Sequence, residues 1–89
     1  MKLVIYFKKI GEIELRLTNA GKLIYALDFS FNSNLDDLLI SSVDKVLKEN
    51  RIEALSLKTV GVEGDIDKNS SAYKIAVSFI EALKKAHKW

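Results

Sequence analysis

The side chains that most often carry catalytic chemistry are scarce in this sequence. It has one histidine, His87, and no cysteine. His87 stands in a lysine-rich segment near the end of the sequence, with no acidic residue close by to orient it as a catalytic base. Zero cysteines exclude disulfides, thiol catalysis and thiolate metal sites. We therefore predict no catalytic residue and no enzymatic activity.

One segment, residues 65–69, resembles the start of a calcium-binding loop. Its Asp-Ile-Asp-Lys-Asn order places polar side chains at the first three ligand positions. The pattern then fails, because Ser70 replaces the glycine of the turn and Ala76 replaces the glutamate that would bind the ion through both oxygens. We predict no metal site, and we interpret Asp65 and Asp67 as acidic loop residues that help to cap the following helix.

The short glycine-containing segment 61–64 is a candidate for a phosphate-binding loop. It lacks the number of glycines, the lysine and the hydroxyl residue that such a loop uses to hold phosphates. A connecting segment is the better interpretation, and we predict no cofactor.

Lysines near the only tryptophan raise the question of nucleic-acid binding. Lysines can contact phosphates and a tryptophan can stack on a base, although cations in the last turn of a helix also stabilise the helix dipole by themselves. The candidate nucleic-acid contacts are Lys84, Lys85, Lys88 and Trp89.

Composition limits the protein class further. The 89 residues fit one domain, and 48% apolar residues with 29% charged residues exclude a disordered chain. The formal charge of +2 predicts no dedicated nucleic-acid surface. The apolar run at residues 3–7 is shorter than the core of a signal peptide or a membrane span. We therefore expect a cytoplasmic protein.

Three segments at the start of the sequence have the alternating pattern of β-strands. The first, residues 2–9, is apolar on both faces, which is typical of a central strand. The second, residues 12–18, is apolar on one face and polar on the other. Residues 19–21 tolerate positive φ and predict a turn into a third strand over residues 22–31. Together these strands predict an antiparallel meander.

A helix and a fourth strand follow. Asn34 can cap a helix that runs to Glu49 and carries two aspartates in its first turn, where they favour the positive end of the helix dipole. Residues 54–60 then alternate in polarity, which predicts a strand at an edge of the sheet.

A polar loop is predicted over residues 61–69, and Ser70 or Ser71 caps a last helix that ends at about Lys85. Because a helix separates the third and fourth strands, the fourth can pair parallel to the first through a right-handed crossover. The sequence therefore predicts one domain, residues 1–89, of the α/β (α+β) class. It has the order βββαβα, with two helices and a mixed four-stranded sheet in the order 3-2-1-4.

Both predicted helices carry more apolar surface than one core face requires. The apolar positions of the first helix spread over roughly 200° of its circumference, nearly twice the width of a core-facing stripe. In the last helix we assign the main stripe to the core: Ile75, Ala76, Phe79, Ala82, Leu83 and Ala86. Loops or Trp89 could cover the remaining apolar side chains, but we favour burial by a second chain. The predicted partner interface is Ile40, Val43, Leu47, Tyr73, Val77 and Ile80.

Residues 34–49, 52–57 and 71–83 resemble successive elements of one known lobe. The last segment is the best local match, because it resembles a Thr-Gly-x-Arg-Ile-Gly helix with Lys74 at the arginine position and alanines at the glycine positions. With the βββαβα order, these segments make the chain similar to the N-terminal lobe of the TsaB (YeaZ) family, in the RNase H-like and actin-like ATPase superfamily. The resemblance spans nearly all of this chain and about the first half of a family member.

The chain departs from that pattern at two places. The first strand ends at residues 6–9 as Tyr-Phe-Lys-Lys, without the aspartate and hydroxyl residues of the ATPase relatives. The glycine- and proline-rich segment before the last helix is replaced by residues 61–69. Both departures point away from nucleotide chemistry.

The resemblance implies a function through partners. TsaB proteins are non-catalytic partners of the TsaD enzyme in the pathway that makes threonylcarbamoyladenosine on tRNA, and helices of this lobe form their contact. It implies a non-enzymatic protein–protein interaction module, a reduced TsaB-like subunit that forms a homodimer or binds a TsaD-like protein. Two alternatives remain: a small RNase H-like nucleic-acid-binding domain that uses the lysine-rich C-terminal end, and a degenerate enzyme with an unseen ligand.

Overall fold

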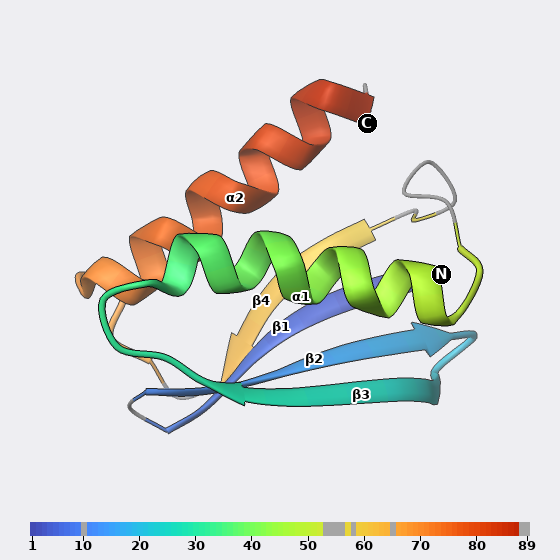
Figure 1. The fold of residues 1–89 in the computed structure, drawn as a ribbon, viewed down its shortest axis with the longest axis horizontal. Helices are drawn as coiled ribbons and strands as arrows, with labels where there is room; N and C mark the ends of the chain where they lie inside the picture. Colours follow the sequence, from blue (N-terminus) through green and yellow to red (C-terminus); the bar gives the residue numbers. More distant parts are fainter. Residues whose placement is uncertain (10, 53–56, 58, 65, 88–89) are drawn as a thin grey trace.

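A single mixed sheet with both helices on one face makes up the fold (Figure 1). The computed structural model describes residues 1–9, 11–52, 57, 59–64 and 66–87, the last four by their backbone alone. Its elements are β1 (Lys2–Lys9), β2 (Glu12–Asn19), β3 (Lys22–Ser30), α1 (Leu35–Glu49), β4 (Thr59–Gly64) and α2 (Ser71–His87). The strand order is β3-β2-β1-β4. The predicted class, element order and sheet order are confirmed.

Strand β1 is central because it is apolar on both faces. It pairs antiparallel with β2 and parallel with β4. Leu3, Ile5 and Phe7 face the helices and are 0 to 2% exposed, and Val4 on the opposite face is only 5% exposed. The face of β1 toward the helices is therefore buried, whereas on the opposite face Val4 is buried and Tyr6 is half-buried.

The turn between β2 and β3 forms as the sequence predicts. Ala20 and Gly21 have φ of 53° and 82°, which is the conformation of a two-residue type I′ hairpin turn. Leu17 pairs with Tyr25 and Thr18 pairs with Leu23, so Ile24 is an extra residue on β3. This β-bulge interrupts the regular pairing at the start of an edge strand.

The core lies between the sheet and the helices. α1 contributes four apolar side chains that recur along one line of the helix, and α2 contributes two. The buried apolar residues of the core cluster are Leu3, Ile5, Phe7, Ile13, Leu15, Leu17, Leu35, Leu39, Val43, Val46, Leu57, Val60, Ala76 and Ile80. One layer of helices thus covers one face of the sheet, and no helix of the described residues lies over the opposite face (Figure 1).

The position of the fourth strand corrects the prediction. β4 runs over Thr59–Gly64, so the first part of the predicted loop 61–69 is strand, whereas residues 53–56 and 58 of the predicted strand lie outside the described residues. Glycines are read as loop signals, but here Gly64 pairs with Phe7 on β1. A Cβ at Gly64 would lie 2.3 Å from the Phe7 carbonyl oxygen. Glycine is therefore required by the close approach of the two strands.

The two helices begin differently. Ser70 accepts a hydrogen bond from the backbone N–H of Tyr73 at 3.2 Å, so it caps α2 as predicted. Asn34 is the first residue before α1, but its side chain accepts from the N–H of Asn32 and makes no capping bond to the helix. The predicted start of α1 is confirmed, and the predicted capping by the Asn34 side chain is wrong.

The face of the sheet opposite the helices carries charged side chains. The guanidinium of Arg16 lies 3.9 Å from the centre of the Tyr6 ring and donates a hydrogen bond to Glu14, which raises the pKa of Arg16. Lys2 pairs with Glu63 and Lys8 with Asp28, each at 3.6 Å. Both signs of charge alternate on this face, which suits contact with water rather than with a polyanion.

Candidate functional site

A groove between the two helices is the best candidate for an interaction site. α2 diverges from α1 toward its C-terminal end (Figure 1). The interhelical groove has a volume of about 430 Å³ and is lined by Asp36, Ile40, Lys74, Ile75, Ser78, Phe79 and Ala82. Its apolar surface comes from both helices, since Ile40 lies on α1 and Ile75, Phe79 and Ala82 lie on α2.

Ile40 is the most unusual side chain of this groove. It is 60% exposed and is among three large apolar side chains that the described part of the chain leaves mostly in water. Ile75 and Phe79 across the groove are half-buried and also pack against the core. An exposed isoleucine beside a half-buried aromatic ring forms an apolar surface that a partner can cover.

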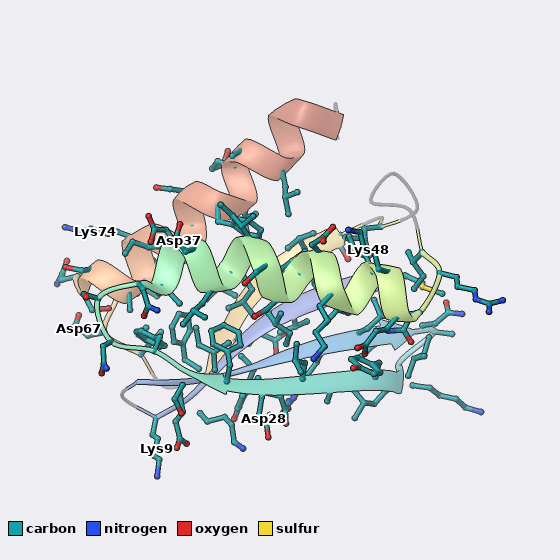
Figure 2. The ribbon with its side chains drawn as sticks, in the orientation of Figure 1. Lys9, Asp28, Asp37, Lys48, Asp67 and Lys74 are labelled. Carbon is teal, nitrogen blue, oxygen red and sulfur yellow. The ribbon has the colours of Figure 1, made fainter. Side chains whose placement is uncertain are left out.

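Opposite charges flank the apolar surface. Asp36 lies in the first turn of α1, and Lys74 lies in the first turn of α2. Both residues therefore stand at the N-terminal ends of their helices. Lys74 and Asp37, the neighbour of Asp36, are labelled in Figure 2. Both Asp36 and Lys74 are exposed and line the groove. Within the part of the chain that the structure describes, neither forms an ion pair.

The six residues of the predicted partner interface fall into different environments. Ile40 is exposed at the groove, while Leu47, Tyr73 and Val77 are half-buried, and Leu47 packs against the core. Val43 and Ile80 are 4% and 6% exposed and belong to the core of the chain itself. The prediction that a second chain buries Val43 and Ile80 is therefore wrong.

The prediction for α2 is only partly correct. Ala76 is buried as predicted, but Ile80, predicted to face a partner, packs inward beside it. Ile75 and Phe79, predicted to face the core, pack against it and also line the groove, as does Ala82. Both stripes are apolar, so the sequence shows that α2 has two faces to cover but not which of them meets the sheet.

Val43 could have been placed from the sequence. It stands four residues after Leu39 and eight after Leu35, and residues at these spacings share one face of a helix. All three are buried. Asp36 and Lys74 were missed because charged residues on a helix surface are common and gain meaning only when the helices are placed together.

The remaining predicted sites concern the end of the chain and the loop before α2. Lys84, Lys85 and His87 lie in the last turns of α2, where only the backbone is described, and Lys88 and Trp89 lie outside the described residues. The nucleic-acid contacts stay a prediction. Asp67 accepts the N–H of Asn69 at 2.9 Å, so it orders the loop before α2.

Neither metal ligands nor a membrane helix are found in the described part of the chain. No group of three or more His, Cys, Asp or Glu side chains there could hold a metal ion. No helix there is long and apolar enough to cross a membrane.

Comparison with known proteins does not place the chain. No protein-family model matches it, and no curated protein sequence matches it. The resemblance to the TsaB family therefore stays a prediction, and the groove itself has to carry the functional argument.

Proposed function

We propose that the chain is a non-enzymatic protein–protein interaction module whose interhelical groove binds a second copy of the same chain. The observation that carries the proposal is the exposure of Ile40 in a groove that also holds Ile75 and Phe79. Complete burial of a fully exposed side chain of this size contributes about 1.5 to 3 kcal/mol. Ile40 is 60% exposed, so its burial by a partner would add a part of this amount.

Charge favours a second copy as the partner. Asp36 on α1 and Lys74 on α2 stand on the two helices that form the groove. In a two-fold dimer the same surface meets itself, so Asp36 of each copy can face Lys74 of the other. A surface that carries both charges at its rim is self-complementary, which supports a homodimer over a partner of one charge sign.

The test is sedimentation of the chain over a wide range of concentrations, with Ile40→Glu as the main variant. We expect the parent to dimerise as concentration rises and Ile40→Glu to stay monomeric with an unchanged far-UV CD spectrum. Ile24→Glu is the matched control, because Ile24 is 45% exposed on β3, outside the groove. Equal effects of the two substitutions, or a parent that is monomeric throughout, would contradict the proposal.

A charge exchange separates self-association from binding to another protein. Asp36→Lys and Lys74→Asp should each weaken the dimer, and the double variant should restore it, because the exchange preserves every Asp–Lys pair across a two-fold axis. A heterologous partner would not exchange its own charges, so the double variant would stay impaired toward it.

The TsaB resemblance supplies one specific heterologous partner. A TsaD-like enzyme could use the same groove, and the βββαβα order supports this variant of the proposal. Co-purification with a TsaD-like protein that Ile40→Glu abolishes, from a parent that is monomeric alone, would favour it over the homodimer.

A further inference from the structure

A second hollow lies at the end of the sheet and shares no lining residue with the interhelical groove. This sheet-end cavity has a volume of about 770 Å³. It is bounded by the end of β1, the turn before β2, the segment after β3, the loop before α2 and the first turn of α2. Small-molecule sites commonly have volumes of about 300 to 1,000 Å³. β1 and β4 are parallel and end here side by side, since Phe7 pairs with Gly64, and ligands often bind beyond the carboxyl ends of parallel strands.

The lining of the sheet-end cavity is mainly apolar. Phe31 after β3 is a half-buried aromatic residue, and Ile66 and Ala72 are aliphatic, whereas Phe7 borders the cavity as a residue of the core that is only 2% exposed. The N–H of Phe31 donates to the carbonyl of Gly11 at 2.9 Å, which fixes the segment after β3 against the turn before β2. An aromatic residue held on such paired backbone favours a flat apolar ligand.

The charges around this cavity are each offset by a neighbour. Lys9 Nζ lies 3.8 Å from Glu12 Oε2 and its side chain is 72% exposed. Figure 2 shows Lys9 pointing away from the helices. Asp67 precedes the N-terminal end of α2, whose partial positive charge compensates a carboxylate. Lys9 and Asp67 are the charged residues that line the cavity in the part of the chain that the structure describes, and burying an ion in an apolar cavity is costly.

Two uncharged polar residues complete the lining. Asn32 provides an amide, and Ser70 provides a hydroxyl that already accepts the N–H of Tyr73 and keeps its own O–H as a donor. We propose that the sheet-end cavity binds a small uncharged aromatic molecule with one hydrogen-bonding group. This site shares no lining residue with the interhelical groove. If the cavity does not bind such a molecule, the proposed dimer is unaffected, and if the chain does not dimerise, the proposal for the cavity is unaffected.

The test uses three probes that share one ring system and differ in charge: indole, tryptamine and indole-3-acetate. We expect indole to shift the backbone amide NMR signals of Gly11, Asn32 and Ala72 saturably, with a dissociation constant on the order of 1 mM, as befits a ligand of few atoms. The cationic and anionic probes should bind about tenfold more weakly or worse, because each would bury a charge.

Ala72→Leu should reduce indole binding about tenfold by filling the cavity, since the added methyl groups occupy the space of the ring. Ala26→Leu is the matched control, at an exposed position on β3 that does not line the cavity, and should leave binding unchanged. Three results would overturn the proposal. The three probes could bind equally well, the NMR shifts could centre on Ile40 and Ser78 of the groove, or Ala72→Leu could bind indole as well as the parent does. If Ala72→Leu does not fold, the position of the shifts in the parent decides the question.

Discussion

Replacing Gly64 by alanine tests the placement of β4 most directly. Gly64 has φ of 109°, a conformation that residues with a Cβ rarely adopt, and this costs about 1 to 3 kcal/mol. The new Cβ would also lie 2.3 Å from the carbonyl oxygen and 2.8 Å from the backbone nitrogen of Phe7. These are backbone atoms of a central strand, so relief requires β1 and β4 to separate.

The two effects together should lower the free energy of unfolding by about 3 kcal/mol. In a domain of this size, a loss of that magnitude lowers the melting temperature by about 12 to 24 °C. Thermal unfolding followed by far-UV CD measures the change, and urea unfolding gives the free energy independently.

Two other glycines act as internal controls for the Gly64 experiment. Gly21 has φ of 82° but nothing within 4 Å of its added Cβ, so Gly21→Ala should cost only the backbone term, about 1 kcal/mol. Gly61 in β4 has open space and no positive φ, so Gly61→Ala should stay within about 0.5 kcal/mol of the parent. If Gly64→Ala lowers the free energy of unfolding no more than Gly21→Ala does, β4 does not approach Phe7 closely. That result would be expected if residues 61–69 formed a loop.

Three further predictions concern a helix cap, a pH dependence and the core. Ser70→Ala should destabilise the fold by about 1 kcal/mol in urea unfolding, while Asn34→Ala should have a smaller effect because its side chain makes no capping bond. The hydroxyl of Tyr25 donates to the Glu49 carboxylate, which raises the pKa of Tyr25 above its ordinary 10.0. The stabilisation by this hydrogen bond is therefore complete below pH 10.0 and is lost as the pH rises through the higher pKa of Tyr25 in the folded protein. Above pH 10.0 the parent should therefore lose stability relative to Tyr25→Phe. Ile80→Ala should cost about 2 to 4 kcal/mol, a value that a residue buried only by a second chain would not show in the monomer.

Much of the sheet could be predicted from local patterns. The two apolar faces of β1 identify it as the central strand, and the clean alternation of β2 identifies its buried face. The helix between β3 and β4 requires a crossover, which explains why β4 pairs parallel with β1. These features depend on period-two patterns and on chain connectivity, and both are present in the sequence.

The misplaced features depend on contacts between distant segments. Gly61 and Gly64 look like loop residues until β1 is placed beside them, and only then does the lack of a side chain at Gly64 become a requirement. In the same way, Ile75 and Ile80 are equally apolar, and only the packing of α2 in the fold shows that Ile80 lies in the core and Ile75 on the groove. The rotation of a helix with two apolar stripes is a tertiary property.

The pairing of β1 with β4 also sets an order of assembly. β1, β2 and β3 are joined by short turns, so their pairing closes small loops, whereas Lys2 of β1 pairs with Thr59 of β4, which follows α1 in the sequence. Closing the longer loop costs more chain entropy. We therefore expect the meander to form early, and β4 and α2 to dock late and to detach first in partial unfolding. The interhelical groove and the sheet-end cavity both include residues of α2, so a bound partner or ligand would slow hydrogen exchange most in this helix.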